Sequence, residues 1–410
     1  MPDLLRANPK FFRVWLSEIV SGFGDWFNLV ATATLISILT GSSNALGVLF
    51  VLRLLSPFLI APFGGVLADR YSQILIMLLS DISRGLVVLC FLLVREPGDV
   101  WLLYLLTFLQ LGLSGLFVPA RAAILPDIVE PQHLGAANAL SSTTYAIMQV
   151  VGAAAAGFLA GSIGLYETFV VDAFTYFISA LFILRITSNK TQLQESVSSS
   201  VSFFRMYFDG LTYLAKNVET FMLSIQKGMN SFFVTGALNV ITMILALRYF
   251  PIGLNGSYTA GLLFCMTGIG TAIGPVIARR FISDNPAALR KGLLYSYLLS
   301  AVGLLCIAPL SSLLAVSIGM LIRGMGGGMM FVLSTHLLHI RLPKNLRGRI
   351  FSNEYAIRTL LGAIGTAIFS FFVDSVVGFA VMIWISVLAA LIPAIVWGWW
   401  LIYSRSSIET

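Results

Sequence analysis

Charged side chains are scarce in this chain. They make up only 10% of its 410 residues, against 58% hydrophobic residues, and the mean hydropathy is +0.92. A soluble domain carries roughly 25% charged residues. This deficit excludes an ordinary water-soluble enzyme or binding module and indicates a chain that lies in lipid.

Cysteine and histidine are rarer still. The three cysteines, Cys90, Cys265 and Cys306, all lie inside apolar runs, with neither metal-ligand nor disulfide spacing. His336 and His339 could share a helical face, but we predict no metal site there. Neither a nucleotide-binding loop nor a nucleophile–base constellation is visible. We therefore expect no cofactor, no metal and no enzymatic activity.

The apolar residues gather in twelve runs, each near the roughly 20 residues that cross a bilayer as a helix. We predict an all-α polytopic membrane protein with twelve transmembrane helices, the first of them a retained span rather than a cleaved signal. The expected spans are 12–38, 46–67, 74–94, 100–120, 136–161, 166–186, 226–249, 257–279, 292–309, 311–335, 354–374 and 377–402.

A polar, serine-rich stretch divides these spans into two sets of six. We predict an N-terminal six-helix bundle over 1–186, a cytoplasmic linker over 187–225 and a C-terminal six-helix bundle over 226–410. An interfacial helix is expected within the linker, at 203–214.

Basic residues favour one side of the predicted membrane. Of those in loops and at span ends, only Arg95 and Arg248 fall on the opposite side. The positive-inside rule then places both termini in the cytoplasm. The same asymmetry accounts for the net charge of +7 without a nucleic-acid partner.

The stretch Gly65-Val-Leu-Ala-Asp69-Arg70, between the second and third runs, is expected to be a tight turn at the membrane surface. It resembles the loop signature G-x-L-a-D-r-x-G-r-[RK] of the major facilitator superfamily at Gly65, Leu67, Asp69 and Arg70, whereas Ser72 replaces the second glycine. Residues 61–70 also align with 271–280, which indicates a duplicated six-span unit.

Two further stretches, 118–129 and 342–352, resemble the branch of that family with macrolide-efflux proteins, siderophore exporters and a lysophospholipid transporter. The resemblance implies two pseudo-symmetric six-helix bundles, with spans one, four, seven and ten around a central cavity. It also implies secondary active transport by alternating access, in a monomer.

Polar residues inside spans are costly and mark functional candidates. Glu18, Ser21, Asp25, Asn28 and Thr32 advance by three or four residues and form one stripe on the first span. As substrate or proton sites we predict Asp25, Glu18, Arg53, Gln110, Asn239 and Arg323.

Asp25 would exchange a proton or pair with a cationic substrate group. Arg53, whose depth differs by about six residues or roughly 9 Å of helix rise, would hold it charged or be released by it. A permanent, purely structural ion pair is the alternative. Arg323 in the cavity would suit an anionic substrate.

A cytoplasmic gate is implied by the same resemblance. Asp69 would interact with the start of the eleventh span, which favours a negative charge at its positive dipole end. The gate candidates are Asp69, Arg70, Asp81, Arg84, Asp127, Arg347, Arg349 and Glu354. Within this set, Asp81 is spaced to pair with Arg84, and Glu354 with Arg358, along one helix face, and for both pairs we favour a structural role.

Together these features predict a multi-pass transporter of the bacterial inner membrane, an antiporter that exports a drug-like compound or a siderophore in exchange for protons. Its partners would be that small amphipathic molecule, protons and membrane lipids. Movement of lysophospholipid between leaflets is the first alternative. A membrane receptor or partner protein that has lost transport is the second.

Overall fold

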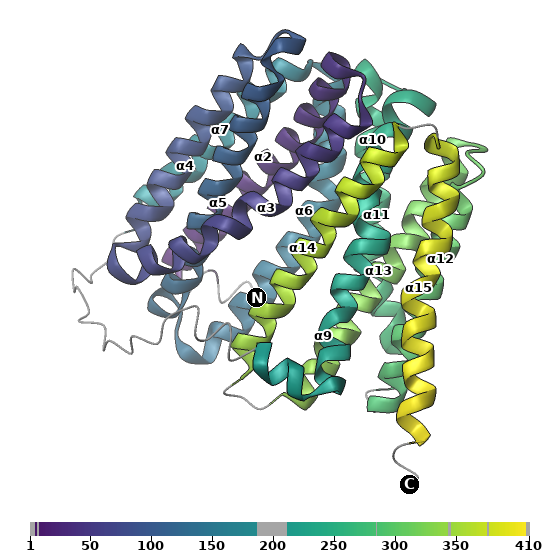
Figure 1. Cartoon of the computed structure of the whole chain (residues 1–410). Helices are drawn as coiled ribbons and strands as arrows, with labels where there is room; N and C mark the ends of the chain where they lie inside the picture. The colour runs from purple at the N-terminus through teal and green to yellow at the C-terminus, as the bar shows by residue number, and fades with distance from the viewer. Residues whose placement is uncertain are drawn as a thin grey trace. The chain divides into compact units, whose positions relative to one another are not determined.

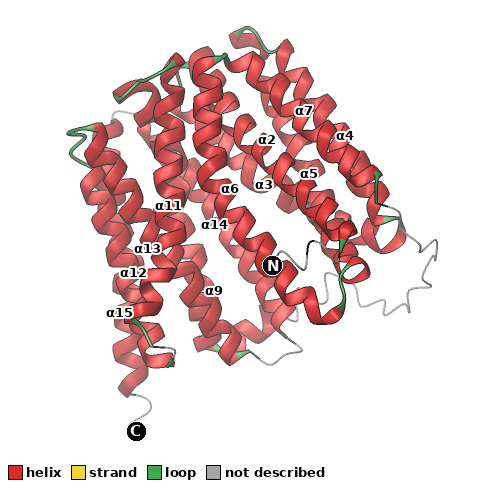
Figure 2. Cartoon of the chain, turned by 180° about the vertical axis from the view of Figure 1, so that it is seen from behind, coloured by secondary structure: helices red, strands yellow, loops and turns green. Residues whose placement is uncertain are grey.

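The computed structural model describes residues 5, 8–186, 211–283, 285–342, 346–374 and 377–406, without the side chains of Asp69, Pro131, Arg347, Gly348 and residues 404–406. The described residues form helices joined by short turns, and no strand occurs among them (Figures 1 and 2). This is the expected arrangement in lipid, where every backbone polar group needs an internal partner.

Six long helices come from the first half of the chain. They are α2 (Pro9–Thr40), α3 (Ser43–Arg70), α4 (Gln73–Cys90), α5 (Val100–Ile128), α6 (Leu134–Ser162) and α7 (Leu165–Leu184). Short 3₁₀ turns, η1 (Phe91–Leu93), η2 (Pro97–Asp99) and η3 (Pro131–His133), lie between them.

The second half begins with a composite helix in which two π-helical segments, η4 and η5, interrupt the α-helix. It comprises α9 (Val218–Asn230), η4 (Ser231–Thr235), α10 (Gly236–Ile244) and η5 (Leu245–Tyr249). After the 3₁₀ turn η6 (Leu254–Gly256) come α11 (Ser257–Phe281), α12 (Pro286–Ile307), α13 (Leu313–Arg341), α14 (Arg347–Val373) and α15 (Phe379–Ser406).

The prediction of twelve membrane spans is confirmed. Among the described residues, 12 helices are long and apolar enough to cross a membrane, and each overlaps one expected range. Several run farther than predicted. The fourth span continues through Pro119 and Pro126 to Ile128, the tenth reaches Arg341 and the seventh starts at Val218. Hydropathy marks the apolar part of a helix, whereas backbone hydrogen bonding continues beyond it.

The tight turn predicted at Gly65–Arg70 is wrong. That stretch is the last part of α3, and the chain reverses only at Tyr71 and Ser72. The side chain of Ser72 accepts a hydrogen bond from the Leu75 backbone amide and so caps α4. Arg70 lies in the last turn of α3, where the helix dipole stabilises a positive charge.

The chain divides into two compact units. Unit 1 comprises Met1–Gly41, Leu52–Ser200 and Ala246–Gly261, and unit 2 comprises Ser42–Val51, Val201–Leu245 and Leu262–Thr410. The boundaries therefore cut α3 and α11, whose first turns group with the other half of the chain. Most of the predicted interfacial helix at 203–214 lies outside the described residues. The described residues 211–216 are helical.

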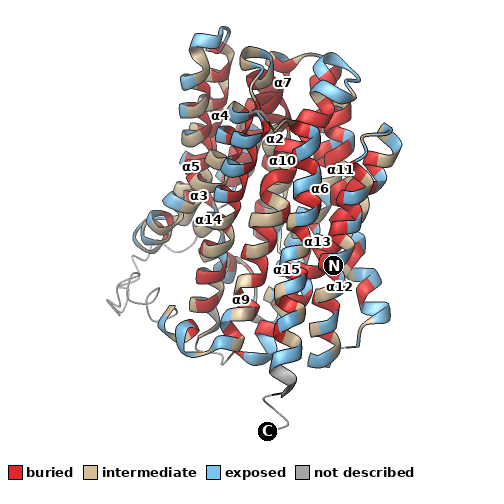
Figure 3. Cartoon of the chain, turned by 45° about the vertical axis from the view of Figure 1, so that its right-hand side comes forward, coloured by how far each residue is buried: buried red, intermediate tan, exposed pale blue. Residues whose placement is uncertain are grey.

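Within unit 1, α2 packs on α6 and α7, and α4 packs on α5 and α7 (Figure 1). Small residues permit close approach. A Cβ on Gly157 would lie 2.6 Å from the Cα of Gly261, so only glycine fits where α6 meets the start of α11. Buried and exposed positions alternate along many of the helices (Figure 3), whereas in α2 every residue from Val30 to Ile36 is buried.

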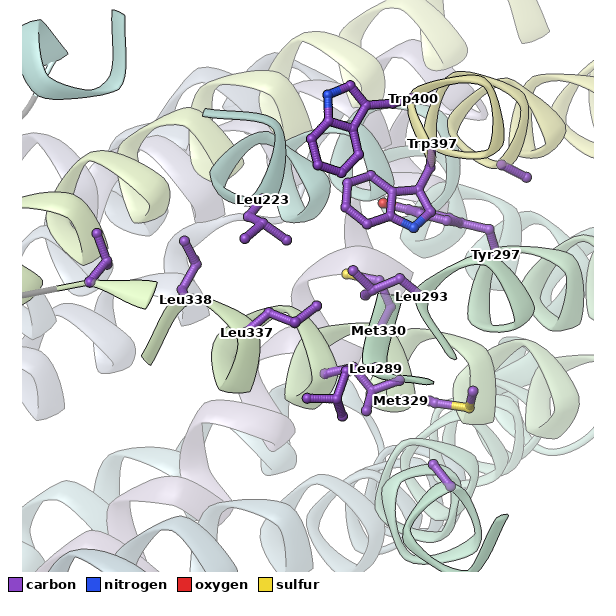
Figure 4. Close-up of a cluster of buried hydrophobic side chains, with 14 of the residues drawn as sticks. Leu223, Leu289, Leu293, Tyr297, Met329, Met330, Leu337, Leu338, Trp397 and Trp400 are labelled. Carbon is purple, nitrogen blue, oxygen red and sulfur yellow. The ribbon is translucent and has the colours of Figure 1, made fainter. Parts of the chain in front are cut away.

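Unit 2 has its apolar core at α12, α13 and α15. Trp397 and Trp400 stack with ring centroids 4.9 Å apart, and Leu293, Met330 and Leu337 belong to the same buried cluster (Figure 4). The indole of Trp397 donates a hydrogen bond to the backbone carbonyl of Arg290, so this large side chain is buried without an unpaired donor.

Candidate functional site

Unit 1 encloses a group of polar side chains at the level where α2, α3, α4, α5 and α7 come together. We call this group the Asp25 cluster, and its members are Asp25, Asn28, Arg53, Asp81, Arg84, Gln110, Asp172, Tyr176 and Ser179. The predicted polar stripe of the first span supplies Asp25 and Asn28. Four of the predicted site and gate residues, Arg53, Asp81, Arg84 and Gln110, also belong to the cluster.

The carboxylate of Asp25 is held by two donors. The Nη2 atom of Arg84 and the hydroxyl of Tyr176 each lie 2.6 Å from its Oδ1 atom. The same Arg84 nitrogen donates to the Tyr176 oxygen at 2.8 Å, and Gln110 donates to that oxygen at 3.1 Å. The guanidinium also lies 4.2 Å from the centre of the Tyr176 ring. Asp25 of α2 and Tyr176 of α7 thus hold Arg84 directly, and Gln110 of α5 supports Tyr176.

Asp25 differs from its partners in exposure. Its side chain is 41% exposed, whereas that of Arg84 is 3% exposed. A carboxylate is costly to expose to hydrocarbon. We therefore infer that the open side of Asp25 faces water. The cluster thus has one carboxylate at its surface, backed by a buried cation.

Among the described residues, Arg53 forms no ion pair with the Asp25 carboxylate, although the two interact electrostatically. Its guanidinium donates to the side-chain oxygen of Asn28 at 3.2 Å and to the backbone carbonyl of Asp25 at 3.4 Å. The carboxylate of Asp25 pairs with Arg84 instead, so the predicted ion pair is corrected. The position of a residue along its span does not by itself say which helix faces the carboxylate.

Asp81 and Arg84 pair as their spacing predicts, with Nη1 of Arg84 3.5 Å from Oδ1 of Asp81. Ser179 donates to the other oxygen of Asp81 at 2.5 Å. Both side chains are buried. The structure therefore places them in the Asp25 cluster, and their assignment to a gate stays a prediction.

The sequence interpretation missed Asp172 on α7. This residue is fully buried, and its carboxylate interacts with the side chain of Asn28. It interacts electrostatically with Arg84 and Arg53. Gly24 leaves the necessary room, since a Cβ there would lie 2.4 Å from Oδ1 of Asp172. An acidic residue well inside the sixth apolar run was the signal available.

The cluster carries an imbalance of charge. It contains three carboxylates, Asp25, Asp81 and Asp172, and two guanidinium groups, Arg53 and Arg84. With every group ionised, one negative charge remains uncompensated. A buried net charge is costly, so the cluster has the chemistry to take up one positive charge.

Glu18, on the same stripe of α2, forms a second ion pair. Its carboxylate lies 2.5 Å from Nε and 2.9 Å from Nη2 of Arg121, and Ser141 of α6 contacts both side chains. Arg121 was missed as a partner because it was assigned to a loop. It lies on α5, which continues past the predicted end of the span.

In unit 2, Arg323 of α13 is buried. Its Nη2 atom donates to the Thr235 hydroxyl at 2.7 Å, and Asn230 donates to the same oxygen at 3.0 Å. Thr235 belongs to the π-helical segment η4, a type of helix defect frequent at functional sites. Asn239, one turn farther along, is half-buried on α10.

Glu354 does not pair with Arg358 as its spacing predicts. Its carboxylate lies 2.9 Å from the Nζ atom of Lys227 on α9, and both side chains are almost fully buried. Arg358 instead lies over the ring of Tyr355, 5.1 Å from its centre. The correction has a simple cause, since α9 packs directly on α14 and brings in a cation from far along the chain.

The remaining gate candidates are distributed over helix ends. Arg70 ends α3 and is exposed, Asp127 is exposed near the end of α5, and Arg349 is half-buried in the first turn of α14. The side chains of Asp69 and Arg347 lie outside the described residues. The predicted contact of Asp69 with the eleventh span therefore stays a prediction.

Comparisons with known proteins agree with this architecture. Residues 14–366 match the model of the Major Facilitator Superfamily. The chain is 30% identical over 379 residues to the putative bacilysin exporter BacE of Bacillus subtilis (strain 168), covering 88% of each chain. It is 23% identical to macrolide efflux protein A of Streptococcus pyogenes, covering 90% of each.

Among solved structures, a bacterial homolog of the human lysosomal transporter Spinster, inward-facing and unoccupied, superposes with a TM-score of 0.74. It covers 98% of this chain and 97% of that chain at 14% identity, which shows a common fold. The family match extends over most of the chain and includes both units. The twelve spans, the buried charges within them and this match establish that the chain belongs to the major facilitator superfamily of membrane transporters.

Proposed function

We propose that the protein exports a small amphipathic molecule across the bacterial inner membrane by alternating access, in exchange for protons. Relatives named as a putative bacilysin exporter and a macrolide efflux protein support the direction of transport. The basic residues at span ends support cytoplasmic termini. The Asp25 cluster is the observation that carries the proposal.

The geometry of this cluster supports proton exchange. Asp25 is the cluster's exposed carboxylate, and its Oδ1 atom can accept either the donors Arg84 and Tyr176 or a proton. Protonation would remove the charge that holds Arg84 against α2. Arg84 would then keep its bonds to Asp81 and Tyr176, so α2 could separate from α4 and α7 at this level.

The Glu18–Arg121 pair extends this path. Glu18 lies seven residues before Asp25 on the same stripe, roughly 10 Å along the helix. With the N-terminus in the cytoplasm, this pair lies on the cytoplasmic side of Asp25. Its partly exposed carboxylate would relay protons between Asp25 and that side.

The test uses purified protein in liposomes with an imposed pH gradient and a pH-sensitive dye inside. Candidate drugs, siderophores and lysophospholipids are added in turn. We expect one class to dissipate the gradient with wild type but not with Asp25→Asn. The matched control is Asp99→Asn, which alters an exposed carboxylate at a helix start and leaves the response intact.

Two outcomes contradict the proposal. A substrate that moves while the gradient stays intact would eliminate proton coupling. Equal dissipation by wild type and Asp25→Asn would exclude Asp25 as the proton site.

Lysophospholipid movement is a second candidate, and one cavity favours it. A hollow of about 530 Å³ in unit 2 is lined mainly by apolar side chains of α11, α12 and α13, including Val276, Leu289 and Met329. Arg279 and His336 line the same hollow and could meet a phosphate. Movement of lysophospholipid in the liposome test, with the gradient unchanged, would favour this function.

A further inference from the structure

A smaller cavity in unit 2 has a different chemistry. Its volume is about 280 Å³, and side chains of α9, α13 and α14 line it. Ligand pockets usually measure about 300 to 1,000 Å³, so this cavity suits a small molecule. Charged side chains line the cavity, and their contact with hydrocarbon would be too costly. We infer that the cavity opens to water.

The cation Lys227 is already engaged in this cavity. Its Nζ atom lies 2.9 Å from the carboxylate of Glu354, donates to the Thr335 hydroxyl at 2.7 Å and lies 4.2 Å from the centre of the Phe331 ring. The side chains of the ion pair are 5% and 4% exposed. Lys227 and Glu354 therefore neutralise each other.

Arg358 is the other cation of the lining. Among the described residues no carboxylate forms an ion pair with it, and its guanidinium lies over the Tyr355 ring, 5.1 Å from the centre. Glu354 interacts with it only at longer range. With His339 of the lining counted as neutral, two cations and one carboxylate give the cavity a net charge of +1, which matches a monoanion.

Most of the remaining wall is aromatic. Phe331 and Tyr355 line the cavity and are exposed, and Phe351 completes the wall beside them. Aromatic rings favour flat, unsaturated partners through stacking, beyond the area that they bury. The cavity thus combines one guanidinium available for a bidentate bond with a surface for a ring.

We propose that this cavity binds a small aromatic carboxylic acid, with Arg358 as the partner of the carboxylate and Phe331, Phe351 and Tyr355 around the ring. The identification of this ligand with the exported molecule rests on the proposed function. Binding itself does not, since it needs no gradient.

The test measures binding to the full chain in nanodiscs by equilibrium dialysis, with empty nanodiscs to subtract partition into lipid. The probes are radiolabelled 1-naphthaleneacetate and the neutral 1-naphthaleneacetamide, which share ring and size. We expect saturable binding of the carboxylate and an affinity about tenfold or more lower for the amide, because a bond to a charged partner contributes that much.

Variants identify the site. Arg358→Gln should weaken carboxylate binding about tenfold and leave the amide unchanged, whereas Phe331→Ala should weaken both probes. Arg280→Gln, which alters an exposed arginine elsewhere in unit 2, should change neither. Arg358→Lys keeps the charge, so it should retain the preference for the carboxylate even if Arg358→Gln does not fold.

Three results would overturn the inference. They are equal affinity for carboxylate and amide, unchanged carboxylate binding in Arg358→Gln, and the absence of saturable binding. Each of them would leave proton exchange at Asp25 untouched, so the failure of this inference is distinguishable from the failure of the proposed function.

Discussion

Replacement of Arg84 by glutamine should destabilise the protein strongly. The guanidinium lies 2.6 Å from Asp25 and 3.5 Å from Asp81, and it donates to the Tyr176 hydroxyl at 2.8 Å. Glutamine can keep at most part of the hydrogen bonding and none of the charge. The substitution therefore leaves buried carboxylates without their main cation.

The magnitude follows from the two carboxylates separately. The Asp25 side chain is 41% exposed, so water screens its interaction with Arg84. The loss of that ion pair should therefore cost at most about 1 kcal/mol. Asp81 is fully buried and keeps only the Ser179 hydrogen bond. Removal of one partner from a buried pair costs about 3 to 5 kcal/mol. We expect a total near 4 kcal/mol.

The assay is denaturant unfolding in mixed micelles, followed by tryptophan fluorescence, with the free energy of unfolding compared among variants in one detergent. Arg95→Gln is the matched control. Arg95 is exposed and stacks on Tyr166 at 3.8 Å, so its loss should cost about 1 kcal/mol or less.

A double variant identifies the cause. If an uncompensated charge is responsible, adding Asp81→Asn to Arg84→Gln should recover about 1 to 3 kcal/mol, within the range measured for residues in contact. The reasoning is refuted if Arg84→Gln costs no more than Arg95→Gln. It also fails if the double variant is less stable than Arg84→Gln alone.

Two further predictions use the same unfolding measurement. Lys227→Met should lower the free energy of unfolding by about 3 to 5 kcal/mol because Glu354 then stays buried without a cation. The double variant Lys227→Met/Glu354→Gln should lie within about 2 kcal/mol of wild type. Equal losses in the single and double variants would show that the buried charge is not responsible. Gly24→Val should cost about 1 to 3 kcal/mol because its Cβ would lie 2.2 Å from the Thr175 hydroxyl oxygen, and Gly22→Val, where the nearest atom is 3.7 Å away, should cost clearly less. Similar losses in the two glycine variants would contradict the packing argument.

The polar stripe of the first span shows how far the sequence could go toward the site. The three- and four-residue spacing of Glu18, Asp25 and Asn28 placed them on one face, because a helix turns by a fixed angle per residue. The same reasoning did not give their partners. Arg84 and Arg121 reach the stripe from α4 and α5, and that depends on how helices rotate and pack.

Glu354 illustrates the same limit. Its spacing to Arg358 favours a local pair, and such pairs contribute only a few tenths of a kcal/mol on an open helix surface. Lys227 forms the ion pair instead, since the packing of α9 on α14 buries both charges together. Leaving one of these buried charges without its partner would cost several kcal/mol, which outweighs the local preference for Arg358.

The sequence by itself determined the twelve spans and the polar face of the first span, because hydropathy and helical periodicity are local properties. Short motifs such as Gly65–Arg70 indicated the family. Tertiary structure alone decided that Asp25 pairs with Arg84, that Asp172 joins the same cluster and that Arg358 lies in a cavity with three aromatic rings. Such contacts join residues far apart in the chain, and only the packing of whole helices fixes which side chains meet.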